Sequence, residues 1–212
     1  MSQYEETFNT WNKVAKIYEE KFMHLDLYNE TYDTFCKALT GKHAKILEVG
    51  CGPGNIAKYI LNQHANFEIL GIDIAPNMIE LAKQNNPNAR FEVMDARAID
   101  QLKTKFNGVI AGFCIPYLSL NETQHFISNS HQLLDDDGVL YISFVEGKYS
   151  RSGFKTNSSG DKVYFYYYEL ATITNEIEKL GFKAAQILKV NFKRSATEIE
   201  EHTIIITRKS NR

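Results

Sequence analysis

A glycine-rich segment, Glu48–Gly54, directly follows a short apolar run at Lys45–Val49. The run has the length and composition of a buried β-strand. Three glycines at alternate positions let the backbone turn tightly and approach a ligand closely. Asn55 then opens an amphipathic helical pattern to about residue 64. A strand, a glycine turn and a helix in this order predict a ligand site in which helix N-terminal amides face a polar group.

Apolar runs alternate with amphipathic segments through the middle of the chain. This alternation predicts an α/β fold whose parallel sheet is covered by helices on both faces. Two closely spaced apolar runs near the C-terminus are expected to pair antiparallel at the sheet edge. The predicted strands are Lys45–Val49, Glu68–Ile72, Arg90–Met94, Gly108–Phe113, Val139–Phe144, Ala184–Phe192 and His202–Arg208.

The segments around this alternating region differ from it. Residues 1–40 carry two stripes of apolar side chains at helical spacing and are expected to form a helical lid. Within 148–168, residues 150–162 are rich in Ser, Gly, Lys and Asn, which favours a flexible loop, and an aromatic run at strand spacing follows. We expect 148–168 to be an insertion on the substrate side. The length of 212 residues suits a single domain, 1–212, with 44–145 as its cofactor-binding core.

Acidic residues end the next two predicted strands. In a parallel sheet, ligands bind beyond the carboxyl ends of the strands. Asp73 is placed there to accept hydrogen bonds from both hydroxyls of a ribose, and Asp95 to receive an adenine amino group. A dinucleotide fingerprint would need glycine where Asn55 stands. Glu48, before the turn, suits a ligand with a positive end, so the pattern favours S-adenosylmethionine (SAM), which carries an ammonium and a sulfonium.

Four segments resemble the class I SAM-dependent methyltransferases of the small-molecule type. They are Ile46–Gly54, Gly71–Lys83, Phe91–Ile99 and Leu133–Phe144, and the resemblance is strong over 44–145. It implies a Rossmann-like, doubly wound, mostly parallel seven-stranded sheet with an antiparallel edge strand. It also implies in-line displacement of the methyl group from SAM, leaving S-adenosylhomocysteine. The chain departs from the family pattern at Asn107, where an aspartate usually follows the phenylalanine.

The resemblance also implies roles for individual residues in holding SAM. The family residue that matches Glu48 helps to orient the methionine amine, and the one that matches Asp73 binds the ribose. Tyr18, on the N-terminal stripe, is expected to face the sulfonium or the carboxylate. The full set of expected cofactor-binding residues is Tyr18, Glu48, Gly50, Cys51, Gly52, Asp73, Ile74, Met78, Asp95, Ala96 and Phe113. Of these, Gly50 and Gly52 lie under the methionine part, Ile74 or Met78 packs on the adenine, Asp95 and Ala96 recognise its edge, and the backbone near Phe113 meets the amine.

The pattern identifies no catalytic residue. The sulfonium of SAM is already an activated leaving group, so the positioning of the reactants can supply much of the catalysis. Four side chains are candidates. Tyr18 would line the cofactor or simply pack in the core, and Tyr117 would line the substrate pocket. His125 would act as a base or be a solvated helix residue. Glu146 would contact the substrate or be a plain loop carboxylate.

Several classes of site and partner are not expected. The net charge of −2 gives no basic face for nucleic acid, and Cys114–Tyr117 lacks the key residues of the amino-methyltransferase signature that it resembles. The histidines have no metal-ligand spacing, and Asp135–Asp137 is expected to be a solvated turn, so no metal is predicted. Three scattered cysteines and the absence of a long apolar run predict a cytoplasmic protein without membrane insertion, monomeric or homodimeric.

Three functions are therefore compatible with the sequence. The leading one is transfer of the SAM methyl group to a small molecule. A second is binding of SAM or S-adenosylhomocysteine without transfer, in the service of a partner or as a regulator. A third, a nicotinamide oxidoreductase, would use the same sheet but is disfavoured by the glycine spacing.

Overall fold

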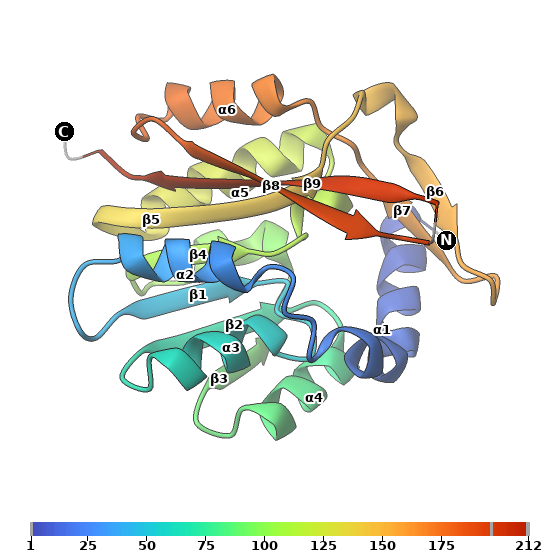
Figure 1. Cartoon of the computed structure of the whole chain (residues 1–212), viewed down its shortest axis with the longest axis horizontal. Helices are drawn as coiled ribbons and strands as arrows, with labels where there is room; N and C mark the ends of the chain where they lie inside the picture. The colour runs from blue at the N-terminus through green and yellow to red at the C-terminus, as the bar shows by residue number, and fades with distance from the viewer. Residues whose placement is uncertain (1, 196, 211–212) are drawn as a thin grey trace.

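The computed structural model describes residues 2–195 and 197–210. Its main sheet has seven strands in the order β3-β2-β1-β4-β5-β9-β8 (Figure 1). The strands are β1 (Lys45–Val49), β2 (Glu68–Asp73), β3 (Arg90–Val93), β4 (Phe106–Ala111), β5 (Leu134–Val145), β8 (Gln186–Lys193) and β9 (Ile199–Arg208). The helices are α1 (Gln3–Phe22), α2 (Asn29–Ala38), α3 (Asn55–Gln63), α4 (Pro76–Asn85), α5 (Leu120–Leu133) and α6 (Leu170–Lys179). Short 3₁₀ turns η1 (Ala96–Gln101), η2 (Ile115–Tyr117) and η3 (Tyr149–Arg151) complete the set.

The sheet confirms the predicted doubly wound, mostly parallel architecture. β1 is an interior strand and pairs in parallel with both β2 and β4. The order reverses on either side of β1, which creates a topological switch point at the carboxyl ends of β1 and β4. β9 runs antiparallel to β5, as predicted for this end of the sheet, and β8 is the outermost strand.

Helices cover both faces of the sheet and divide the core into two layers. α2, α3 and α4 pack on one face, where Phe35 and Ile110 are fully buried among apolar neighbours. α5 and α6 pack on the other, where Ile127 and Ile142 are equally buried. Because successive strand residues point to opposite faces, a strand such as β1 contributes apolar side chains to both layers.

The expected turn at Asp135–Asp137 is wrong, because β5 begins earlier than its apolar run. Leu134 already pairs with Phe106 of β4, and the register shifts before Val139 pairs with Gly108. The aspartates therefore form a β-bulge, an irregularity that absorbs extra residues within a strand. Asp137 has a φ of 59° there. The long apolar stretch alone did not reveal that the preceding acidic residues extend the strand.

The predicted loop at 150–162 is wrong in part, because it contains a strand, whereas the aromatic run after it does form a short strand. β6 (Gly153–Thr156) and β7 (Lys162–Phe165) form a separate antiparallel hairpin that does not join the main sheet. Aromatic rings fasten the hairpin, with Phe154 and Tyr164 packed edge to face at 5.2 Å. A polar composition hid the first strand because β6 is largely exposed, whereas β7 is mostly half-buried.

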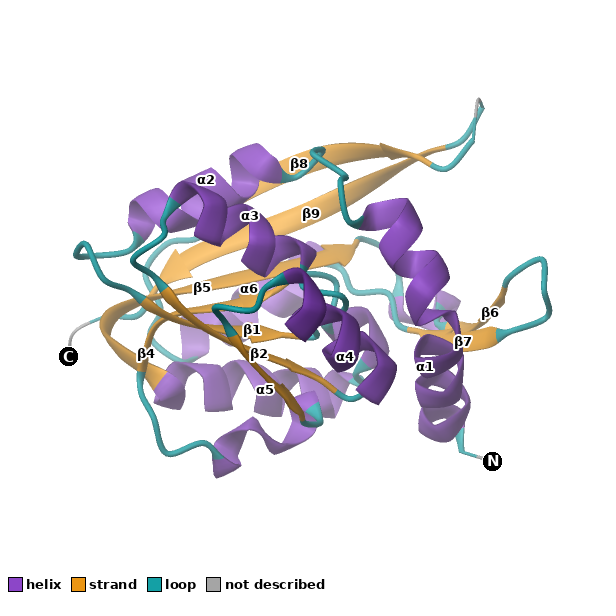
Figure 2. Cartoon of the chain, turned by 90° about the horizontal axis from the view of Figure 1, so that it is seen from below, coloured by secondary structure: helices purple, strands orange, loops and turns teal. Residues whose placement is uncertain are grey.

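The two N-terminal helices have different places in the fold. α1 stands at the carboxyl end of the sheet beside the β6–β7 hairpin, whereas α2 lies on the sheet face (Figure 2). Tyr32 and Phe35 of α2 are buried in the core of that face. A polar contact between Thr7 and the amide of Tyr164 (2.9 Å) fixes α1 to the hairpin. No described helix is long and apolar enough to cross a membrane.

Candidate functional site

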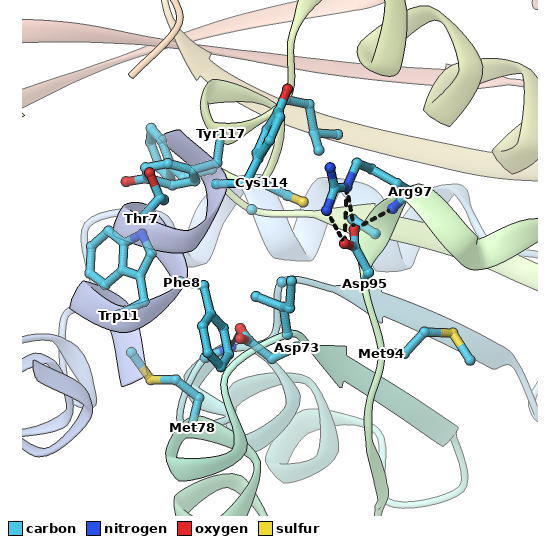
Figure 3. Close-up of a pocket in the computed structure, with 18 of the residues that line it drawn as sticks. Thr7, Phe8, Trp11, Asp73, Met78, Met94, Asp95, Arg97, Cys114 and Tyr117 are labelled. Carbon is cyan, nitrogen blue, oxygen red and sulfur yellow. Dashed lines mark hydrogen bonds and ion pairs between the residues drawn. The ribbon is translucent and has the colours of Figure 1, made fainter. Parts of the chain in front are cut away.

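A cavity of about 160 Å³ lies between α1 and the carboxyl ends of the parallel strands (Figure 3). Its walls come from α1 and from the segments that follow β1, β2, β3 and β4. The lining residues are Tyr4, Thr7, Phe8, Trp11, Tyr18, Gly50, Gly52, Asp73, Ile74, Met78, Met94, Asp95, Ala96, Arg97, Gly112, Phe113, Cys114, Tyr117 and Leu118. The structure thus brings together in one cavity most of the residues that the sequence predicted to hold SAM.

The glycine turn between β1 and α3 forms the floor of this cavity. Gly50, Gly52 and Gly54 have φ values of +70°, +52° and +81°, a region that side chains strongly disfavour. A Cβ atom on Gly50 would lie 3.2 Å from the Cβ of Cys114. The turn therefore needs glycine for its backbone shape and, at Gly50, for its close approach to the segment after β4.

Asp73 connects the end of β2 to the glycine turn. Its Oδ2 accepts a hydrogen bond from the amide of Gly52 and its Oδ1 one from the amide of Ala75, each at 2.9 Å. Burial raises the pKa of the carboxyl, and these two amides oppose the rise. A carboxylate has about four acceptor positions, so capacity remains for two ligand hydroxyls.

Glu48 is buried beneath the turn and does not line the cavity. It is 1% exposed, and no described residue completes a hydrogen bond to either of its oxygens. Burial raises its pKa to about 8, although the nearby amide of Ala57 partly opposes the shift. A buried carboxyl without a partner is costly. A cation bound above the turn would offset that cost, which fits the predicted role toward the methionine amine.

An ionic cluster that the sequence did not reveal closes the cavity beside Asp95. The guanidinium of Arg97 makes two contacts of 2.9–3.0 Å through Nε to the carboxylate of Asp95, and the Arg97 amide adds another at 2.8 Å. Arg97 also meets Glu122 at 3.3 Å and stacks 4.4 Å from the ring centre of Tyr4. Tyr4 donates a hydrogen bond to Glu122. These bonds raise the pKa of Arg97, first through Asp95.

The predicted contact of Asp95 with an adenine amino group therefore requires Arg97 to share the carboxylate. Glu122 could have been noticed, because Ser119 and Glu122 form a capping box at the start of α5. Nothing in the local sequence pairs Tyr4 with Glu122, since 118 residues separate them.

Aromatic side chains of α1 form the wall opposite the glycine turn. Tyr18 lies over the turn, 3.7 Å from where a Cβ of Gly52 would be. Burial raises the pKa of Tyr18 to about 12, with smaller contributions from the carboxylates of Asp73 and Glu48. Trp11 meets Tyr18 and Tyr117 edge to face at 5.5 and 5.4 Å. The helical stripe in the sequence was the available signal for these residues.

Phe113 lines the cavity in a strained conformation, with a φ of +54°. Its amide already donates to Ser143 Oγ at 2.9 Å, so this amide is not free for a ligand. Its ring packs 4.6 Å from His202, which joins a buried chain. In that chain Tyr28 Oη lies 2.7 Å from His202 Nδ1, and Glu200 lies 2.9 Å from Nε2. No local sequence pattern pointed to this network behind Phe113.

Three further predicted residues lie outside the cavity. His125 is exposed. It lies on the solvent side of α5, because the buried face of this helix carries Thr123, Phe126 and Ile127. The carboxylate of Glu146 is bound by Lys189 and by Thr203 (3.1 Å), which lie on β8 and β9. Cys51 is buried under the turn at 2% exposure. His125 and Glu146 thus lie outside this cavity, whereas the other two catalytic candidates, Tyr18 and Tyr117, line it.

The residues present fit SAM better than a metal ion. The turn carries glycines where a Cβ would intrude, Asp73 has acceptor capacity, and the carboxyl of Glu48 has no hydrogen-bond partner among the described residues. SAM carries one net positive charge, which suits a cavity lined by Asp73 and Asp95. Among residues 2–195 and 197–210, no group of three His, Cys, Asp or Glu side chains is arranged to hold a metal.

Comparison with known proteins agrees with this geometry. Residues 46–138 match a family described as a methyltransferase domain. A malonyl-[acyl-carrier protein] O-methyltransferase of Acetivibrio thermocellus is 35% identical over 100 residues, which are 46% of this chain and 34% of that protein. A tRNA N(3)-methylcytidine methyltransferase of Schizosaccharomyces pombe is 27% identical over 185 residues, 77% of this chain and 56% of that one.

Solved structures share the fold at low identity. A magnesium protoporphyrin IX methyltransferase from Synechocystis PCC 6803 with bound SAM has a TM-score of 0.71 at 17% identity. The superposed region covers 99% of this chain and 98% of that protein's chain. The [4+2]-cyclase SpnF has a TM-score of 0.67 at 15% identity, and covers 86% and 81%. The chain spans only 34–56% of the length of several curated relatives. Several of these similar structures hold SAM or S-adenosylhomocysteine, which supports SAM as the cofactor of this chain.

Proposed function

Because the chain belongs to the class I SAM-dependent methyltransferases, we propose that it moves the SAM methyl group to a small molecule. The acceptor would enter the cavity on the side of Tyr117, and α1 would act as the lid. The observation that carries the proposal is the cavity itself, where Gly50, Gly52 and Asp73 face an aromatic wall. That wall is uncharged, which suits a compact organic acceptor better than a nucleic-acid backbone.

Bound SAM supplies a methyl group already activated by its sulfonium. The work left to the protein is to bind, orient and exclude water. Asp73 would hold the ribose while keeping the turn in place through Gly52. The rings of Phe8, Trp11 and Tyr117 would keep water from the reacting atoms.

The acceptor would reach the cavity with its nucleophile already reactive. Burial raises the pKa of Tyr117 and of Cys114, so both side chains stay protonated and neither removes a proton at neutral pH. The carboxylate of Asp95 is engaged by Arg97. A carboxylate or an unprotonated amine needs no base, and an O-methyltransferase acting on a malonyl carrier is among the relatives. We therefore favour an acceptor that is ionised or nucleophilic at neutral pH.

A second candidate is binding of SAM or S-adenosylhomocysteine without methyl transfer. The two carboxylates that line the described cavity, Asp73 and Asp95, are both engaged by hydrogen bonds, and a [4+2]-cyclase shares the fold. These observations are equally compatible with a methyltransferase. They therefore do not favour the second candidate over the first.

One experiment separates the two. Calorimetry would measure SAM and S-adenosylhomocysteine binding, and a coupled assay would measure S-adenosylhomocysteine release with a panel of acceptors. The panel would contain small carboxylic acids, phenols, thiols, amines, a malonyl-carrier protein and tRNA. We expect binding of both nucleosides and turnover with a low-molecular-weight acceptor. Turnover with tRNA alone would reject a small-molecule acceptor, and tight binding without turnover on any acceptor would favour the second candidate.

A further inference from the structure

The indole nitrogen of Trp11 is a buried donor without a partner. It exposes less than 1 Å², and no described residue accepts a hydrogen bond from it. Trp11 itself lines the cavity, and Figure 3 shows it on the α1 side, across from Asp95 and Arg97. A buried N–H group left unpaired costs about 1–3 kcal/mol, and native proteins satisfy nearly all such groups. A donor of this kind at a ligand cavity indicates an acceptor atom on the ligand.

The neighbours of Trp11 place this donor at the methionine end of the cofactor site. Its ring meets Tyr18 edge to face at 5.5 Å, and Tyr18 lies over the glycine turn. The methionine part of SAM ends in an ammonium and a carboxylate. The ammonium suits the side of Asp73 and Glu48, because a nearby cation favours ionisation of the buried Glu48 carboxyl. The charge of Asp73 would repel the methionine carboxylate from the same side.

The carboxylate must therefore turn away from those acids, toward α1. Arg97, the one guanidinium that lines the cavity among the described residues, is held by Asp95 and Glu122 on the far side. The donors that α1 presents there are the hydroxyl of Tyr18 and the indole nitrogen of Trp11, and the buried Trp11 nitrogen has no partner among the described residues. A hydrogen bond from N–H to a charged oxygen is stronger than one between neutral groups.

We propose that Trp11 is a cofactor-binding residue whose Nε1–H donates to the methionine carboxylate of SAM. The inference rests on the proposed function, because it assumes that SAM occupies this cavity. It gives α1 a specific task beyond covering the site, since the helix then recognises the amino-acid end of the cofactor.

The test compares two ligands that differ only in the carboxylate. S-Adenosylhomocysteine and its decarboxylated analogue would be titrated by calorimetry into the wild type and into Trp11→Phe. Loss of the N–H should weaken S-adenosylhomocysteine binding by about tenfold or more beyond any loss for the analogue. Loss of ring area affects both ligands equally, so the difference between them isolates the carboxylate contact.

A second variant guards against altered packing in Trp11→Phe. Replacing Trp11 with benzothienylalanine keeps the ring shape and exchanges the N–H for a sulfur atom. It should show the same selective loss for S-adenosylhomocysteine. Equal losses for the two ligands in both variants, or no loss in either, would overturn the assignment. Failure of the wild type to bind S-adenosylhomocysteine at all would instead overturn the proposed function, so the two failures are distinguishable.

Discussion

The carboxylate of Asp73 accepts a hydrogen bond from the amide of Gly52 at 2.9 Å, and so joins the end of β2 to the turn after β1. A second bond, from the amide of Ala75, fixes the same carboxylate from its own strand end. Asp73 is therefore part of the scaffold of the turn as well as a candidate ligand for ribose. A change at this position acts on both, and the two effects have to be measured separately.

Replacing Asp73 with Asn should weaken SAM binding with limited effect on folding. The amide keeps one acceptor oxygen for a backbone amide but loses the charge and the second acceptor. We expect a loss of about 1.5–3 kcal/mol in binding free energy, the range for a hydrogen bond to a charged group. Calorimetry gives the affinity and thermal unfolding gives the stability. Unchanged affinity in a folded Asp73→Asn protein would remove this residue from the site.

Glu48 should make the stability of the ligand-free protein fall with rising pH. Its pKa is about 8 in the folded state against 4.5 ordinarily, so the folded state holds a proton that the unfolded state releases between these values. Stability from this group is therefore present below pH 4.5 and lost as pH rises through 8. The loss in free energy of unfolding is roughly a few kcal/mol, because a tenfold change in a proton-binding constant corresponds to about 1.4 kcal/mol.

The matched variant for this prediction is Glu48→Gln, which keeps the shape and removes the titration. Urea unfolding at a series of pH values should give a shallower pH dependence for the variant between pH 4.5 and 8. The same slope in both proteins would show that Glu48 does not titrate in this range. Calorimetry in buffers of different ionisation enthalpy should further detect proton release when SAM binds to the wild type.

A side chain at Gly54 should destabilise the protein more than one at an open turn. Its φ is +81°, and a Cβ there would lie 2.4 Å from Nδ2 of Asn86. Gly160 has a similar φ of +84° with nothing within 4 Å of the same position. Gly160→Ala therefore reports the backbone strain alone, about 1–2 kcal/mol. Thermal unfolding should show a larger loss for Gly54→Ala, and equal losses would contradict the steric account.

Removing residues 2–22 should reduce cofactor binding while leaving the sheet folded. α1 contributes Trp11 and Tyr18 to the cavity, and its other contacts include α4, the hairpin and Glu122 of α5. A longer deletion through residue 40 would instead remove Phe35, which is fully buried. Circular dichroism would follow the fold and calorimetry the affinity for S-adenosylhomocysteine. Undiminished affinity after the short deletion would reject α1 as a lid.

Phe35→Ala serves as the contrasting change for that deletion. Truncating a buried phenylalanine typically costs about 3–5 kcal/mol. We expect the variant to lose stability by this amount while keeping the cavity residues intact. The contrast separates the role of α2 in the core from that of α1 at the site.

Much of the cofactor side could be predicted because its signals are local. The period of apolar residues identifies strands and helices, and the positive φ values of the turn require glycine wherever the turn occurs. Asp73 and Asp95 were found because parallel strands deliver their ends to one edge. The hairpin and the bulge at Asp135–Asp137 were missed, since exposed strands and irregular pairing leave little periodicity.

By itself, the sequence determined the doubly wound sheet and the place of its ligand site, because both follow from the order of strands and turns along the chain. Only the tertiary structure decided that α1 and not α2 covers the site, that Arg97 engages Asp95, and that the Trp11 nitrogen is buried without a partner among the described residues. These depend on contacts between residues far apart in sequence, such as Tyr4 with Glu122. Such contacts are fixed by how the helices pack, and no local pattern encodes them.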